Sequence, residues 1–322
     1  MDAREADVVV IGFGGAGAAA AITAADAGAR VLVLEKLDRG GGATRFSGGS
    51  MRTYVDDRAA ADHIEVLCEG TTDRPVIEAF VRESALNLEW VKQLGGELGP
   101  RSAAIASRFP VIHNLASFTH LPGAHGIGPR RLVKGDRGFG GANLWALLER
   151  NASSRGIDVL FGCAAVKLIR SSDGVTGVIA EKDGRRMHIR ARRGVVLCCG
   201  GFEFDSSLQM NFLGQQFHGL AGTGNTGDGI RMAADVGADL WHMSAVAMSF
   251  GYKVSDFAFA VRHSMPAAGY LYVDKTGHRF VDEGGTDAHL MWSPVATIDT
   301  KTLDRTRVPC LLYTSPSPRD QR

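Results

Sequence analysis

An apolar strand, residues 7–11, runs directly into the glycine pattern Gly12-x-Gly14-x-x-Gly17, and an alanine-rich helix follows. Gly12 permits a tight turn, Gly14 lets a pyrophosphate approach the backbone, and Gly17 allows the helix to pack closely on the strand. The N-terminus of the helix offers free N–H groups and the positive end of its dipole to an anion. This unit therefore predicts a site for the diphosphate of a dinucleotide.

A second apolar strand, residues 30–34, ends in Glu35. An acidic residue at the tip of this strand, about 20 residues past the glycines, typically holds a ribose hydroxyl. Its negative charge disfavours a 2′-phosphate, so NADP is not expected. The alternative is a turn of the same shape that binds no nucleotide, because the glycine pattern alone occurs in many proteins.

Length and composition indicate a globular protein long enough for two domains. The chain has 322 residues, and its 41 glycines gather in clusters that suggest turns around a ligand. The net charge is +1, and the pair Arg192-Arg193 is too short for a nucleic-acid surface. No apolar run reaches the length of a membrane span, and the early first strand leaves no room for a secretory signal. We therefore expect a cytoplasmic protein that does not bind nucleic acid and does not span a membrane.

The spacing of the cysteines predicts neither a disulfide framework nor a zinc site. The chain contains no C-x-x-C pair, and its cysteines are Cys68, Cys163, Cys198, Cys199 and Cys310. Cys198 and Cys199 end an apolar strand, where successive side chains point to opposite faces. We interpret them as small buried hydrophobic residues in a reducing compartment, and we expect no metal site.

The expected elements predict a parallel sheet decorated by insertions, which is an α/β fold. Asp183-Gly184 is typical of a hairpin turn. The expected helices are residues 73–94, 143–154 and 230–236, and the expected strands are residues 158–162, 165–169, 175–181, 187–190, 194–199 and 270–273.

Several segments match one family in the right order. They are residues 10–17 (VIGFGGAG), 34–36 (LEK), 41–49 (GGATRFSGG), 196–203 (VLCCGGFE) and 225–233 (NTGDGIRMA), followed by a capping-domain signature at residues 277–283 (GHRFVDE). Over residues 7–283 the chain thus resembles the flavoprotein family of fumarate reductases, succinate dehydrogenases and 3-ketosteroid dehydrogenases.

The resemblance implies a glutathione-reductase-like, Rossmann-type FAD-binding domain over residues 1–240 and part of an inserted α+β capping domain over residues 241–309. It also implies which residues hold FAD: Gly12, Gly14, Gly15, Ala16, Gly17, Glu35, Lys36, Gly42, Ala43, Thr44, Ser47, Gly48, Gly49, Ala165, Val166, Gly200 and Asp228. The alternative role for Asp228 is that of a helix N-cap. The family's covalent subclass attaches flavin to a histidine near the second glycine loop. Because residues 30–58 contain no histidine, we expect noncovalent FAD.

The resemblance further implies an enzyme that adds or removes hydrogen across a C–C bond beside a carbonyl group. In the fumarate reductases one arginine helps to bind the dicarboxylate and a second relays a proton, but here Asp287 and residues 265–269 stand at those positions. An uncompensated dicarboxylate in such a pocket is costly, so we expect a neutral ketone or enone as the small-molecule substrate. The candidate proton-handling residues are His125, His242, Tyr252, Tyr270 and His289.

Two other functions remain open. An NAD-dependent dehydrogenase would share the first glycine turn, but it would give no reason for the second glycine loop or for the turn at Asp228. A nonenzymatic flavin-binding subunit would pass electrons to a partner protein, and an electron-transfer partner is also conceivable for the enzyme.

The last segment, residues 310–322, has a different character. Residues 310–320 (CLLYTSPSPRD) resemble a translated sequencing-library adapter. We therefore expect a truncated reading frame, in which the native part of this chain ends near residue 308 or 309. The alternative is a genuine Ser/Pro-rich disordered tail. In the family the following part completes the cofactor cleft, so we expect the present chain to bind FAD weakly and to be inactive.

Overall fold

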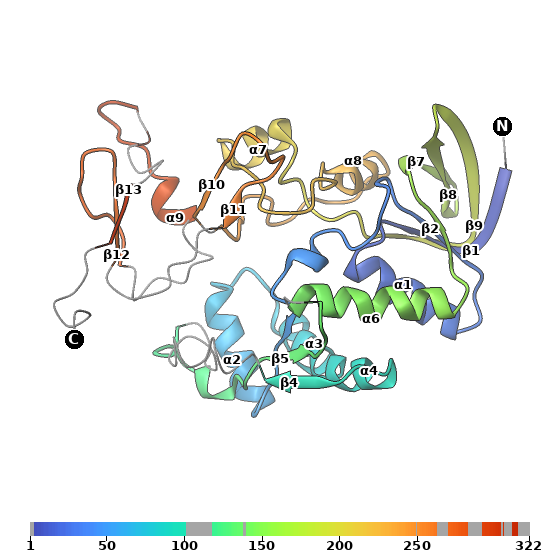
Figure 1. Cartoon of the computed structure of the whole chain (residues 1–322), viewed down its shortest axis with the longest axis horizontal. Coiled ribbons are helices and arrows are strands. Elements are labelled where there is room, and N and C mark those ends of the chain that lie inside the picture. The colour runs from blue at the N-terminus through green and yellow to red at the C-terminus, as the bar shows by residue number, and fades with distance from the viewer. Residues whose placement is uncertain are drawn as a thin grey trace.

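The computed structural model describes residues 3–100, 118–137, 140–248, 250–262, 270–282, 292–303, 305 and 311–314. Its central feature is a six-stranded sheet with the strand order β6-β2-β1-β9-β8-β7 (Figure 1). The first four strands in that order are mutually parallel, and β8 and β7 are antiparallel to their neighbours. The strands are β1 (Ala3–Ile11), β2 (Val31–Leu34), β6 (Asp158–Leu160), β7 (Cys163–Ser171), β8 (Gly174–Lys182) and β9 (Arg185–Leu197).

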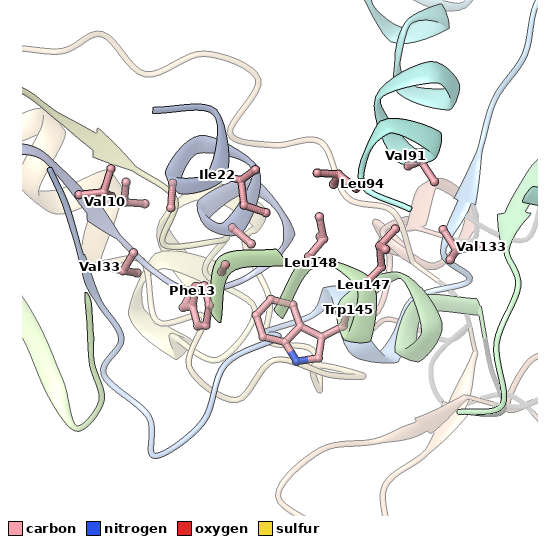
Figure 2. Close-up of a cluster of buried hydrophobic side chains, with 14 residues drawn as sticks. Val10, Phe13, Ile22, Val33, Val91, Leu94, Val133, Trp145, Leu147 and Leu148 are labelled. Atoms are coloured by element: carbon pink, nitrogen blue, oxygen red, sulfur yellow. The ribbon is translucent and has the colours of Figure 1, made fainter. Parts of the chain in front are cut away.

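The C-terminal part of β1 is buried on both faces, because apolar residues occupy successive positions from Val8 to Ile11. Val10 faces one apolar cluster, which helices α1 (Gly15–Asp26) and α6 (Gly140–Ser154) cover side by side. Figure 2 shows this cluster, in which the ring of Phe13 meets that of Trp145 edge to face at 5.0 Å. Val9 faces the other cluster, which includes side chains of β7, β8 and β9. A continuous apolar strand of this kind is typical of a parallel sheet, so the predicted α/β fold is confirmed.

The first glycine turn packs as the sequence predicts. Gly12 has a φ of 98°, and a Cβ atom there would lie 2.3 Å from the carbonyl oxygen of Cys198. A Cβ atom on Gly17 would lie only 1.9 Å from the carbonyl oxygen of Gly12. Helix α1 therefore approaches β1 closely only because residue 17 has no side chain.

A helical excursion separates β2 from α6. It contains α2 (Asp57–Leu67), α3 (Arg74–Ala85) and α4 (Asn87–Gln93). The single helix expected over residues 73–94 is thus two helices, because the amide of Leu86 bonds the carbonyl of Glu83 in a tighter i−3 turn at 3.1 Å. Sequence reasoning missed α2, although Asp56 caps it by accepting a hydrogen bond from the Ala59 amide at 2.9 Å.

The hairpin between β8 and β9 is confirmed. Asp183 and Gly184 both have positive φ values, 50° and 71°, as a two-residue hairpin turn requires. The two strands expected at residues 187–190 and 194–199 are one long strand, β9, which pairs with β8 at its start and with β1 along most of its length.

The remaining elements lie around this domain. Helix α8 occupies Asp228–Asp235. Strand β13 (Leu311–Thr314), within the segment that resembles an adapter, pairs with β12 (Tyr270–Val273) in an antiparallel ladder. Its Leu-Leu-Tyr-Thr sequence suits a strand whatever its origin. The others are η1 (Thr44–Phe46), β3 (Ser50–Met51), β4 (Leu98–Pro100), η2 (Ala124–Gly126), β5 (Arg131–Val133), α7 (Ser206–Leu213), β10 (Gly251–Tyr252), β11 (Val261–Arg262), β12 (Tyr270–Val273), α9 (Trp292–Val295) and β13 (Leu311–Thr314).

Within the described ranges, no helix has the length and apolar character required to cross a bilayer.

Candidate functional site

A cavity of about 690 Å³ opens where β1, β2 and β9 end. Ligands of open α/β sheets bind at the carboxyl ends of the strands, so this is the expected place for a cofactor. The structure brings most of the predicted cofactor residues together around it: Gly12, Gly14, Gly15, Ala16, Glu35, Lys36, Gly42, Ala43, Thr44, Ala165, Gly200 and Asp228.

Five predicted residues do not line this cavity. Gly17 is covered by the carbonyl of Gly12, so its role is helix packing. The second glycine loop turns away after Thr44 and joins α6, where the amide of Gly141 donates to the carbonyl of Ser47 at 3.1 Å. Val166 is exposed because it follows Ala165 on a strand and faces the other way. The five residues are Gly17, Ser47, Gly48, Gly49 and Val166.

The two glycine loops meet at the start of α1. Gly14 is the N-cap, with an extended backbone, and the amide of Gly15 donates to the Thr44 hydroxyl at 3.0 Å. The amide of Gly41 donates to the carbonyl of Phe13 at 2.7 Å. A Cβ atom on Gly14 would find no atom nearer than 3.9 Å, so bare backbone faces open space there. The first turn of a helix leaves amides without intrahelical partners, and Ala16 of this turn lines the cavity. The arrangement suits a diphosphate.

Glu35 is buried, with 8% of its surface exposed, and both of its carboxylate oxygens are engaged. The amide of Phe13 donates to Oε2 at 2.8 Å, and the amide of Leu37 donates to Oε1 at 2.9 Å. The carboxylate therefore holds the first glycine turn against the end of β2. Each carboxylate oxygen has a further lone pair, so Glu35 can still accept a hydrogen bond from a ribose hydroxyl.

Lys36 and Asp228 join β2 to α8 across the cavity. The Lys36 ammonium lies 2.6 Å from the Asp228 carboxylate and donates to the Thr226 hydroxyl at 2.6 Å. Helix α8 takes Gly227 as its N-cap, and no side chain caps it. The alternative that Asp228 is an N-cap is therefore wrong: its carboxylate instead pairs with a cation at the cavity wall.

Cys198 and Cys199 also line the cavity, on opposite faces of the sheet. This confirms the prediction that their side chains diverge. Burial raises the pKa of Cys199 to about 11, and it also raises the pKa of Cys198. Both thiols are protonated at neutral pH, so they act as packing groups rather than nucleophiles.

Sequence reasoning missed two segments of the cavity wall. The first is the loop Gly222, Gly224 and Asn225, where Asn225 donates to the Glu203 carboxylate at 2.6 Å. Its glycine cluster was the available signal. The second follows α8 and has no pattern that marks it: Asp239, Leu240, Trp241 and Met243.

The structure describes the side chains of three of the predicted proton-handling residues, and these three lie outside the cavity wall. His125 lies exposed in η2, and Tyr252 lies exposed on β10. His242 is exposed and stacks on Trp241. Tyr270 lies in β12, and His289 lies outside the described residues, as do Asp287 and residues 265–269. None of His125, His242 and Tyr252 lines the cavity. In the described part of the chain, no three His, Cys, Asp or Glu residues come together as a metal site would need.

The fold and the cavity define a dinucleotide-binding α/β protein. The chain belongs to a family of FAD-binding proteins: the family profile described as an FAD binding domain matches residues 7–311. This confirms the resemblance to flavoproteins of the fumarate reductase, succinate dehydrogenase and 3-ketosteroid dehydrogenase type.

Three known proteins illustrate the likeness. An NADH:fumarate oxidoreductase of Klebsiella pneumoniae is 27% identical over 86% of this chain and 29% of its own length. A digoxin reductase of Eggerthella lenta is 28% identical over 89% of this chain and 56% of its own. The crystal structure of a 3-ketosteroid Δ1-dehydrogenase from Sterolibacterium denitrificans superimposes with a TM-score of 0.82 at 20% identity, covering 96% of this chain and 68% of that one.

The chain spans only part of these curated relatives, between 29% and 56% of their length. The structural match at 20% identity supports the fold. FAD-binding family membership and the bare-backbone cradle at Gly14 agree with each other, so the residues present fit the cofactor.

Proposed function

We propose that the protein to which this chain belongs is an FAD-dependent oxidoreductase that adds or removes hydrogen across a C–C bond beside a carbonyl group. The observation that carries the proposal is the cavity at the strand ends, where the start of α1, Glu35 and the Lys36–Asp228 pair converge. An NAD-dependent dehydrogenase does not account for the second glycine loop, which is hydrogen-bonded to the start of α1 through Thr44.

Each part of the cavity suits one part of the cofactor. The amides at the start of α1 would hold the diphosphate, and Glu35 would accept a hydrogen bond from the adenosine ribose. Ala43 and Thr44 would lie toward the flavin. When bound, FAD accepts or donates a hydride, and the protein supplies position and electrostatics. Residues 30–58 offer no histidine for a covalent link, so the proposed mode is noncovalent.

An aromatic cluster beside the cavity supports a neutral, apolar substrate. The rings of Phe46 and Phe259 lie 6.1 Å apart, and those of Phe257 and Phe259 lie 5.9 Å apart. Phe46 and Phe257 are about half exposed, at 49% and 48%. The Arg45 guanidinium lies over the Phe46 ring at 4.9 Å and steadies it.

This cluster is close to the cofactor cavity in the fold. Phe46 ends the 3₁₀ turn that begins at Thr44, a cavity residue. Ala260 follows Phe259 and donates from its amide to the carbonyl of Gly219 at 2.8 Å, in the loop that reaches the cavity at Gly222. Exposed apolar rings favour a flat, largely apolar ketone or enone, because such a ligand would cover them.

The proposed setting follows from the same observations. The substrate is a small molecule, and an electron-transfer partner would exchange electrons with the flavin. In the described part of the chain the four cysteines are free thiols, which supports a reducing compartment such as the cytoplasm.

Flavin absorbance and transient kinetics test the proposal. The test uses the full-length gene, in which the native continuation of the reading frame replaces residues 310–322. Its purified product should be yellow and should release FAD on acid precipitation. Stopped-flow absorbance should show reduction of the flavin by a saturated ketone, or reoxidation of the reduced flavin by an enone, with fumarate and succinate as comparison ligands. A colourless protein that takes up no flavin would exclude the function. A flavin that responds to no small molecule would instead favour the electron-transfer subunit.

A further inference from the structure

Trp241 lies in the wall of the cavity with its indole ring largely exposed. It lines the cavity, yet 63% of the residue's surface is accessible to solvent. Sequence patterns gave this residue no role. A large aromatic side chain left open at a cavity is stabilised when a flat ligand covers it.

The indole is held in place by its neighbour. It stacks on the His242 ring with centroids 3.6 Å apart and an interplanar angle of 16°. His242 has a φ of 55°, in the left-handed region that residues with a Cβ atom seldom adopt. Backbone strain of this kind concentrates at ligand sites. The amide of Ala245 donates to the His242 carbonyl at 3.2 Å and closes the turn. The aromatic surface is therefore formed before any ligand arrives.

The chain that leads to Trp241 leaves α8 through a tight turn at Gly237, whose φ is 93°. After α8 ends, the amide of Ala238 donates to the carbonyl of Ala233 at 3.0 Å, and Ala233 lines the cavity. Met232, one residue earlier, packs in the same apolar cluster as Ala165 of β7. This part of the cavity therefore lies between α8 and the start of β7.

The start of β7 is also the adenosine end of the cavity. The amide of Cys163 donates to the carbonyl of Glu35 at 2.9 Å, so β7 begins beside the carboxylate expected to hold the ribose. Trp241 follows the end of α8 closely in the chain and lines the same cavity, so we infer that its indole lies at this end, toward the base rather than the flavin.

We propose that Trp241, backed by His242, stacks on the adenine ring of the bound dinucleotide. The inference rests on the proposed FAD site and adds a residue to it. Stacking on an indole needs no hydrogen bond from the base, and alanine substitution of such a residue typically costs about 1–3 kcal/mol of binding.

Calorimetric titration of the 322-residue chain with ADP and with riboflavin separates the two ends of the cofactor. Trp241→Ala should weaken ADP binding roughly 5- to 160-fold, as that stacking energy implies, and should leave riboflavin binding unchanged. Trp241→Phe keeps an aromatic face, so its ADP affinity should stay within about threefold of the wild type. Circular dichroism and the urea midpoint of each variant establish that it is folded.

Tryptophan emission gives a second readout, because the chain has four tryptophans. ADP should quench the wild-type emission and the matched control Trp292→Phe, but not Trp241→Phe. Unchanged ADP affinity in folded Trp241→Ala would overturn the inference, as would loss of riboflavin binding alone. Absence of ADP binding to the wild type would overturn it together with the dinucleotide site. Wild-type ADP binding without FAD binding would count against the proposed function and leave the adenine stack standing.

Discussion

The amide of Phe13 donates a 2.8 Å hydrogen bond to the carboxylate of Glu35, which lies at the end of the neighbouring strand. Phe13 stands between the first two glycines of the diphosphate turn. The residue expected to hold the ribose therefore also fixes the shape of the turn expected to hold the diphosphate. The Glu35 side chain thus links the expected ribose contact to the expected diphosphate contact of the same dinucleotide.

Glu35→Gln tests this coupling. A glutamine amide has one acceptor oxygen, so either the Phe13 or the Leu37 amide would lose its partner. A buried unpaired donor costs about 1–3 kcal/mol, and we expect that loss in the free energy of unfolding in urea together with weaker FAD binding. Glu83→Gln, on an exposed surface pair with Arg82, is the control and should change the unfolding free energy by less than about 0.5 kcal/mol. Equal stability of the two variants would mean that Glu35 does not hold the turn.

Gly17→Ala tests the close approach of α1 to β1. The added Cβ atom would meet the Gly12 carbonyl at 1.9 Å, so the helix must move. We expect a loss of roughly 1–3 kcal/mol in the free energy of unfolding and a large loss of flavin binding, because the helix N-terminus shifts with it. Gly194→Ala is matched to it, since a Cβ atom there meets no atom within 4 Å. If Gly17→Ala were as stable as Gly194→Ala, the packing of α1 on β1 would tolerate a Cβ atom at residue 17.

The raised pKa of Cys199 predicts that the folded protein loses stability at alkaline pH. Burial raises the folded-state pKa of this thiol from 9.0 to about 11, because the apolar surroundings disfavour the thiolate. The unfolded chain loses the proton first, so the free energy of unfolding should fall as the pH rises from about 9 to 11. Urea unfolding at several pH values should show that slope, and Cys199→Ala should reduce it. If the free energy of unfolding fell equally steeply with pH in the wild type and in Cys199→Ala, the Cys199 thiol would not be the cause.

Removal of residues 310–322 tests the expected origin of the tail. Strand β13 makes a two-stranded ladder with β12, and such a pair contributes little stability on its own. A chain that ends at residue 309 should therefore keep the unfolding midpoint and the FAD affinity of the 322-residue chain, within about twofold for the affinity. Weak flavin binding and no turnover are expected of both. A marked loss of folding or binding on truncation would mean that the segment belongs to the protein, and stoichiometric flavin with turnover would show that the chain is sufficient.

The sequence by itself determined the parallel sheet, the first glycine turn and the acidic residue that follows the second strand. These are local patterns. The apolar run of β1 requires burial on both faces, and the absence of a side chain at Gly17 lets α1 approach β1 closely. The strand and hairpin at Asp183 and Gly184 were equally local, because a two-residue turn with positive φ needs such residues.

Only the tertiary structure decided which residues share the cavity. Trp241 and Asn225 are distant in sequence from the glycine turn, and no periodic pattern marks a residue that reaches a ligand from a loop. The Lys36–Asp228 pair joins residues 192 positions apart, and its existence depends on how α8 packs on the sheet. Val166 was predicted to contact the cofactor but does not line the cavity. It follows Ala165 on a strand, so its side chain lies on the opposite face. Secondary structure follows from neighbouring residues, whereas a binding site depends on the long-range packing that brings separate segments together.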